Sequence, residues 1–120
     1  MVLVDTSVWV DHLRRGLPLL ENLLGSGQVA SHPFIIGELA CGGLIQRKKI
    51  LGLLSVLPQV KTATHAEALR LVEMHALFNA GIGWVDVHLL ASALLTDTPI
   101  WTKDLRLAAA ARMLNLAAKE

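Results

Sequence analysis

The chain has 120 residues, of which 53% are hydrophobic, and its 11 basic and 10 acidic side chains give a formal net charge of +1. This length suits one domain with a sizeable core, which we expect to span residues 1–120, and so high an apolar content excludes a disordered chain. The near-neutral charge excludes a polybasic nucleic-acid binder, so any contact with nucleic acid must be local.

The apolar content also bears on partners and location. So much apolar surface on a small body predicts that part of it is covered by a second copy of the chain, as in a homodimer, or by a partner protein. Cys41 is the only cysteine, which excludes an internal disulfide and a disulfide-stapled secreted fold. The chain has neither a basic leader nor a run of about 18 apolar residues, so we expect a cytosolic protein without a membrane segment.

Short apolar runs alternate with helical patterns along the chain. Residues 2–4 predict a buried strand because they directly precede Asp5, Thr6 and Ser7, which are typical of a turn and a helix cap. Further short strands are predicted over residues 28–31, 60–63 and 99–101. Helices are predicted over residues 6–15, 17–24, 33–41, 47–54, 65–78, 84–95 and 105–114, with Thr64 as a cap and with 84–95 the most buried. The tail, residues 115–120, is expected to add an edge strand or to fray. This alternation predicts an α/β fold with a short, mostly parallel central sheet covered by helices on both faces.

Two aspartates follow predicted strands. Asp5 comes directly after the first strand, and Asp104 comes shortly after the strand that ends at residue 101. In open α/β sheets the ligand crevice lies outside the carboxyl ends of the strands, which makes both residues candidates for a functional site. Asp is also a favoured helix N-cap and both precede predicted helices, so capping is the structural alternative.

Two further carboxylates lie on apolar helices. Asp86 is in the first turn of a nearly all-apolar helix, where the helix dipole favours a carboxylate that must still be wetted or paired. Glu38 has Phe34, Ile35 and Gly42 at helical neighbour positions, so its side chain is expected to point along an apolar stripe. The alternatives are capping for Asp86 and an ordinary surface position for Glu38.

The four carboxylates make chemical sense as a set. If they converge on one crevice they repel one another, and hard divalent cations would neutralise them. Oxygen-only ligands favour Mg²⁺ or Mn²⁺, whereas the five histidines show no zinc-site spacing. A metal in such a cluster activates water and stabilises charge on a phosphoryl oxygen, which is the chemistry of phosphodiester hydrolysis without a protein nucleophile.

Four segments in order carry a family resemblance. They are VDTSVW (4–9), GELA (37–40), WVDVHLLASA (84–93) and WTKDLRL (101–107). Together they resemble the PIN-domain ribonucleases, and most closely the VapC-type toxins of bacterial toxin–antitoxin pairs. The resemblance spans nearly the whole chain with order and spacing kept.

The resemblance implies a three-layer α/β sandwich, an acidic Mg²⁺ or Mn²⁺ site, endonucleolytic cleavage of RNA, and inhibition by a small antitoxin protein. Asp5, Glu38, Asp86 and Asp104 match the acidic positions of the family, and Thr102 matches a hydroxyl that is often found two residues before the last Asp. The last strand of the family is poorly marked in this chain.

Other residues have two interpretations each. Lys103 and Arg106 flank Asp104 and are candidates for attracting the RNA backbone, with solvated surface charge as the alternative. Trp84 beside Asp86 is a candidate for stacking on a base, with packing as the alternative. Trp9 and Trp101 are expected to pack in the core.

Two other functions compete with the nuclease. A haloacid-dehalogenase-like phosphatase also begins with a strand that ends in Asp, but that class needs a second Asp two residues on, where this chain has Ser7. A catalytically inactive PIN-like module that only binds RNA or protein is the non-enzyme alternative. The retention of all four carboxylates argues against it.

Overall fold

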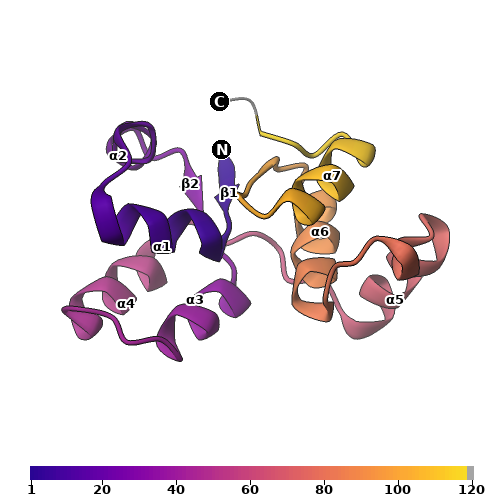
Figure 1. Ribbon diagram of the computed structural model, residues 1–120, viewed down its shortest axis with the longest axis horizontal. Coiled ribbons are helices and arrows are strands. Elements are labelled where there is room, and N and C mark those ends of the chain that lie inside the picture. Colours follow the sequence, from indigo (N-terminus) through magenta and orange to yellow (C-terminus); the bar gives the residue numbers. More distant parts are fainter. Residues whose placement is uncertain (119–120) are drawn as a thin grey trace.

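The computed structural model describes residues 1–118 and shows a small parallel sheet flanked by helices (Figure 1). The strands are β1 (Val2–Val4), β2 (Val29–Ala30) and β3 (Ile100–Trp101). The helices are α1 (Thr6–Arg15), α2 (Pro18–Gly25), α3 (Pro33–Ala40), α4 (Arg47–Val56), α5 (His65–Met74), α6 (Trp84–Thr96) and α7 (Leu105–Met113), with a 3-10 helix η1 at Leu77–Asn79. In the view of Figure 1, α1–α4 lie on one side of β1 and α5–α7 on the other.

The sheet has the order β2-β1-β3, and both pairings are parallel. Leu3 is in register with Ala30 on one side and with Ile100 on the other, and all three side chains are buried. The apolar run at residues 2–4 forms the central strand because a central parallel strand is covered on both faces. The predicted α/β fold is confirmed, and the carboxyl ends of β1 and β3 meet at one edge.

The predicted strand over residues 60–63 is wrong. Gln59 forms a single parallel bridge with Ser31, but the chain then leaves the sheet. The backbone amides of Lys61 and Ala63 donate instead to the hydroxyls of Thr96 and Ser92 on α6, at 2.9 and 3.0 Å. Side-chain hydroxyls therefore satisfy backbone donors that a neighbouring strand would otherwise bind.

The tail adds a minimal edge to the sheet. Ala117 forms a parallel bridge with Ile100, supported by a hydrogen bond from the Ile100 amide to the Leu116 carbonyl at 2.6 Å. The part of the predicted tail at residues 119–120 lies outside the described residues. The edge strand expected for the family is thus present as one bridge.

The helix predicted over residues 65–78 ends earlier than expected. Its start is confirmed by a capping box, in which the Thr64 hydroxyl accepts from the Glu67 amide at 3.1 Å and the Glu67 carboxylate accepts from the Thr64 amide at 2.8 Å. The helix stops at Met74 because Ala76 takes a left-handed conformation with φ 52°. This turn redirects the chain into η1.

The core is built around α6. Every residue from 87 to 93 is buried, which confirms this helix as the most buried of the chain. Trp9 and Trp101 are also buried and pack in the core as predicted. Within residues 1–118, no helix combines the length and the apolar character needed to cross a lipid bilayer.

Candidate active site

Asp5 is a buried carboxylate held by two hydroxyl groups. It is only 6% exposed and caps the N-terminus of α1. Its Oδ2 accepts hydrogen bonds from the hydroxyls of Ser7 and Thr102, each at 2.7 Å. Because a buried charge is costly unless it is hydrogen-bonded, these two donors hold the side chain in one position. Sequence reasoning missed Ser7, although a hydroxyl two residues into a helix capped by Asp is a signal for such a bond.

Asp104 lies in the loop that leaves β3. Its Oδ1 accepts from the amides of Arg106 and Leu107 at 2.9 and 3.0 Å, so it caps α7. Its own amide donates to the Thr102 hydroxyl at 3.1 Å. The capping interpretation of Asp104 is therefore correct, and its backbone amide binds the same hydroxyl that donates to Asp5.

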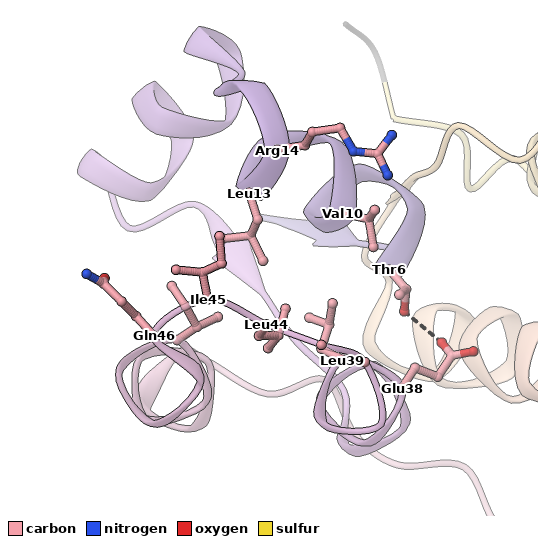
Figure 2. Close-up of a pocket in the computed structure, with 12 residues that line it drawn as sticks. Thr6, Val10, Leu13, Arg14, Glu38, Leu39, Leu44, Ile45 and Gln46 are labelled. Atoms are coloured by element: carbon pink, nitrogen blue, oxygen red, sulfur yellow. Dashed lines mark hydrogen bonds between the residues drawn. The ribbon is translucent and has the colours of Figure 1, made fainter.

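Glu38 does not lie on a buried stripe, and that expectation is wrong. The buried residues of α3 are Ile35 and Leu39, which puts Glu38 on the exposed side of the helix. Its Oε1 accepts a hydrogen bond from the Thr6 hydroxyl at 2.7 Å (Figure 2). This bond joins α3 to the first turn of α1, directly after Asp5. Thr6 was not anticipated as part of the site.

Asp86 is influenced by the other three candidate carboxylates. It is partly buried in the first turn of α6. Burial raises its pKa to about 6, and the negative charges of Asp5, Asp104 and Glu38 add to the rise, while the Gly83 amide opposes it. Residues from four separate segments of the chain therefore act on one carboxyl group. We call Asp5, Glu38, Asp86 and Asp104 the carboxylate cluster.

The donor set of the cluster is oxygen only. Carboxylates with Ser and Thr hydroxyls beside them fit a hard divalent cation such as Mg²⁺ or Mn²⁺. Among the described residues 1–118, no three side chains of His, Cys, Asp or Glu lie close enough together to hold one metal ion. Bare carboxylates repel one another, and hydroxyl donors already bind Asp5 and Glu38.

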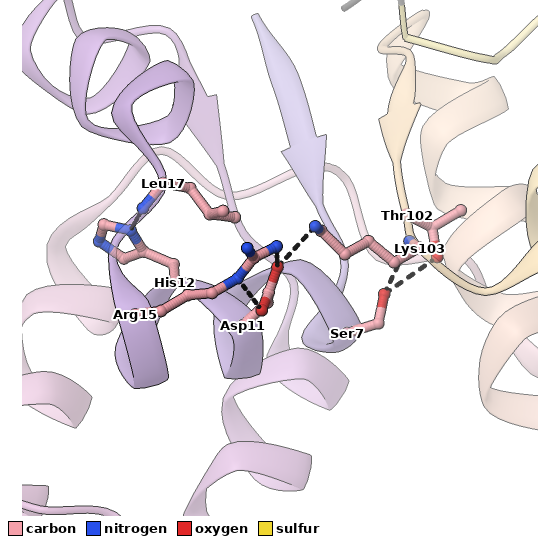
Figure 3. A network of polar contacts seen from close by, with 7 residues as sticks. All are labelled: Ser7, Asp11, His12, Arg15, Leu17, Thr102 and Lys103. Atoms are coloured by element: carbon pink, nitrogen blue, oxygen red, sulfur yellow. Dashed lines mark hydrogen bonds and ion pairs between the residues drawn. The ribbon is translucent and has the colours of Figure 1, made fainter.

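Lys103 and Arg106 differ in their surroundings. The Lys103 ammonium lies 2.5 Å from Asp11, which also binds Arg15, while the Lys103 amide donates to the Ser7 hydroxyl (Figure 3). The hydrogen bonds that Asp11 accepts from the side chains of Arg15 and Lys103 lower its pKa far below the usual range. The bond from Arg15 has the larger effect. The Arg106 guanidinium instead reaches the Gly81 carbonyl at 3.5 Å.

A groove that sequence reasoning did not anticipate opens beside the cluster. It has a volume of about 770 Å³ and lies between α1, α3 and the segment that enters α4 (Figure 2). Its lining is mostly apolar and includes Val10, Leu13, Leu39 and Ile45. Thr6 and Glu38 line the same groove, so its end is continuous with the carboxylate cluster.

The fold and the site define the class of protein. The chain belongs to the PIN-domain family, whose model matches residues 2–113. Two relatives from Mycobacterium tuberculosis, strains CDC 1551 / Oshkosh and ATCC 25618 / H37Rv, are both named Ribonuclease VapC32. Each is 46% identical over 121 residues, which cover 100% of this chain and 98% of the relative. The resemblance to PIN-domain proteins of the VapC type is thereby confirmed.

Proposed function

We propose that this chain is a metal-dependent endoribonuclease that acts as the toxin of a toxin–antitoxin pair. The observation that carries the proposal is that, in a member of the PIN-domain family, the charges of Asp5, Asp104 and Glu38 act together on Asp86. The near full-length similarity to proteins named ribonuclease supports RNA as the substrate.

The carboxylate cluster would hold the metal. Asp5, Asp86 and Asp104 are its proposed ligands, with Glu38 as a further ligand or as an acceptor for a bound water. A bound Mg²⁺ or Mn²⁺ supplies an activated water and stabilises the charge that develops on the scissile phosphate.

The protein's own hydroxyls keep the cluster in place. The hydroxyls of Ser7 and Thr102 both donate hydrogen bonds to Oδ2 of Asp5, so its Oδ1 is free of these two donors. Thr6 does the same for Oε1 of Glu38. A pKa of about 6 leaves Asp86 mostly ionised at neutral pH and protonated in mild acid. We therefore expect protons to compete with the metal for Asp86 in mild acid, so that cleavage falls as the pH is lowered.

The antitoxin is proposed to dock in the groove. Val10 and Leu13 are 41% and 37% exposed there, and Ile45 is 88% exposed, so an apolar peptide segment would remove considerable apolar surface from water. Glu38 gives the end of the groove a negative charge, which favours a basic side chain on that segment. Such a segment would block access to the carboxylate cluster.

We also propose a homodimer. A second face on α5 and α6 exposes Met74, Leu94 and Leu95 beside Glu67, Arg70 and His75, and it shares no lining residue with the groove. A second copy covering this face would leave the groove open for the antitoxin. Light scattering of wild type and Leu94→Glu tests this, and a wild-type monomer at high micromolar concentration would refute it.

The competing phosphatase is not proposed. Ser7 occupies the position where that class needs a second Asp, and its hydroxyl is used to bind Asp5. The inactive PIN-like module is an outcome of the following test.

The test is cleavage of a mixed RNA pool by freshly chelated protein to which Mg²⁺ or Mn²⁺ is returned. Wild type should cleave with metal and not in excess EDTA, and Asp5→Asn should be inactive at equal fold stability. Asp97→Asn is the matched control, because Asp97 is an exposed carboxylate at the far end of α6, in a left-handed conformation that Asn also tolerates. No cleavage under any condition would favour the inactive module, and full activity in EDTA would refute the metal mechanism.

A further inference from the structure

Two aromatic side chains beside the carboxylate cluster are unexpectedly exposed. The chain has three Trp, two Phe and no Tyr, and two of the Trp are in the core. Trp84 is 40% exposed and Phe34 is 37% exposed. Both stand in the first turns of helices, Trp84 in α6 and Phe34 in α3. Packing in the core does not explain why more than a third of each of these two side chains is exposed to solvent.

One buried histidine, His88, contacts both rings. His88 is 6% exposed, and its ring lies 4.7 Å from that of Trp84 and 5.0 Å from that of Phe34, edge to face in both pairs. The ring of His65 contacts Trp84 at 5.2 Å, and the fully buried ring of His32 contacts Phe34 at 5.1 Å. The exposed rings are therefore rigid before any ligand arrives, which reduces the entropy lost on binding.

The buried ring under this surface is itself incompletely satisfied. His88 Nδ1 has no hydrogen-bond partner among the described residues 1–118, although it is fully shielded from water. A buried polar atom without a partner is costly and needs a reason. The ring nitrogens of Trp9 and Trp101 in the core are also without a partner among these residues, so the unpaired nitrogen of His88 does not by itself point to a ligand.

The aromatic surface adjoins the cluster through α3. Trp84 and Asp86 are two residues apart on α6 and point to different sides of that helix, so Trp84 joins the surface through its contact with His88. Phe34 precedes Glu38 by one helical turn on α3. Both rings contact His88, so the first turn of α3, which lies one turn before Glu38, packs against α6.

Without a bound metal, charge gives a polyanion little hold at this place. The metal-free cluster repels phosphates, the cations of Lys103 and Arg15 are both paired with Asp11, and Arg106, whose guanidinium reaches the Gly81 carbonyl, remains for the RNA backbone. Aromatic faces bind unpaired bases without relying on charge, at about 1–3 kcal/mol per stacked base. Exposed rings next to an acidic site are thus a means of holding RNA there.

We propose that Trp84 and Phe34 form a stacking platform for unpaired nucleobases of the RNA that flank the scissile phosphate. This inference rests on the proposed ribonuclease function and assigns these two residues to substrate binding. A platform of this kind selects single-stranded or looped RNA over a regular duplex, because paired bases do not expose their faces.

Binding in EDTA tests the platform without cleavage. The probe is a labelled mixed-sequence single-stranded RNA of ten nucleotides, compared by fluorescence anisotropy with an abasic strand of the same length. Trp84→Ala should weaken binding to the RNA by about five- to hundredfold, the range expected for one lost stack, and should leave abasic binding unchanged. Trp84→Phe should keep most of the affinity because it keeps a ring.

Phe34→Leu and Phe78→Ala complete the set. Phe34→Leu preserves apolar volume but removes the stacking face, so it should also weaken binding to the RNA only. Phe78 is 66% exposed in η1 and is the control, whose substitution should change nothing. Thermal melts establish that each variant is folded.

Three results would overturn the platform: equal RNA affinity in wild type and folded Trp84→Ala, equal losses on RNA and abasic strands, or a loss of antitoxin binding only. The last would make this surface a protein interface. Failure of the nuclease itself is seen separately, as absence of metal-dependent cleavage by wild type. If wild type cleaves RNA and Trp84→Ala still binds RNA normally, the nuclease function is supported and the stacking platform is refuted.

Discussion

The Thr102 hydroxyl donates a 2.7 Å hydrogen bond to the Asp5 carboxylate, across 97 residues of sequence. The bond is possible because β1 and β3 are parallel neighbours, so the residues that follow them emerge at one edge of the sheet. Ser7 donates to the same oxygen at the same distance. A buried charge is thereby fixed by donors from two segments.

Removing one of these donors should weaken both the fold and the site. Thr102→Val keeps the shape of the side chain but leaves Asp5 with one hydroxyl donor, so we expect a loss of about 1–3 kcal/mol in the free energy of unfolding. Cleavage should fall at least about tenfold, the effect of a misplaced ligand. Urea unfolding and cleavage assays measure the two effects. Thr102→Ser keeps the hydroxyl and should retain both, and a fully active Thr102→Val would show that the bond is dispensable.

Asp86→Asn should stabilise the metal-free protein, in a way that depends on pH. The folded-state pKa of Asp86 is about 6, above the ordinary value of 3.8, so its contribution is favourable below pH 3.8 and is lost as the pH rises through 6. The variant should therefore gain about 1 kcal/mol at pH 7 in EDTA, after allowance for partial solvation, and much less at pH 4. Asp97→Asn serves as the control in the same melts. A gain that is equal at both pH values would contradict the repulsion argument.

His32 should make the protein sensitive to mild acid. Burial, and then the nearby His88, lowers the pKa of His32 to about 4, so the folded protein keeps it neutral. Its Nδ1 accepts from the Phe34 amide at 2.9 Å, which leaves Nε2 to donate to Ser92. Stability from this group is fully present above pH 6.5 and is lost as the pH falls toward 4.

The expected slope is up to about 1.4 kcal/mol per pH unit for one proton. It is measured as the difference between wild type and His32→Asn in denaturant unfolding from pH 7.5 to 4. The variant loses stability at neutral pH, since Asn replaces a buried ring, but its curve should be flatter between pH 6.5 and 4. Parallel curves would mean that His32 titrates normally.

Asp11→Asn should loosen the loop that carries Thr102 and Asp104. Asp11 pairs with Lys103 in that loop and with Arg15 one turn along α1. The side chain of Arg15 is 63% exposed and that of Lys103 39%, so we expect only a small loss of stability that high salt reduces. Melts at low and high salt measure it. A large, salt-independent loss would indicate that Asp11 has a role beyond these ion pairs.

Metal binding should be visible without any RNA. A cation that binds only the folded state raises the melting temperature by mass action, so Mn²⁺ or Mg²⁺ should stabilise wild type. Asp5→Asn should show a smaller shift, and Asp97→Asn should match wild type. Ca²⁺ should also raise the melting temperature but block cleavage, because its longer and looser coordination misplaces the attacking water. Equal shifts in wild type and Asp5→Asn would remove Asp5 from the proposed ligands.

Local features of the molecule could be predicted from the sequence because they depend on neighbouring residues. The central strand follows from an apolar run that ends at Asp5, and the start of α5 follows from Thr64 and Glu67, three residues apart. The four family motifs selected the acidic residues of the candidate site, whose role as metal ligands stays a prediction. Their identification needed residue types and spacing, not contacts.

Other features depend on residues that are distant in the chain. Whether residues 60–63 join the sheet is decided by the hydroxyls of Ser92 and Thr96, which take up the backbone donors of that segment. The exposure of Glu38 is decided by which face of α3 packs inward, and an apolar helix such as α3 has no clear inward face in its sequence.

The sequence by itself therefore determined which carboxylates form the candidate site, because an acidic metal centre needs carboxylate side chains and these can be identified from residue types. Only the tertiary structure decided how they are held and what surrounds them. Thr6, Ser7 and Thr102 become partners of the carboxylates, and Phe34 meets Trp84 over His88, because parallel strands and packed helices bring distant segments together. Hydrogen bonds and ring contacts act over a few ångströms, so their partners are set by the packing of the chain and not by its order.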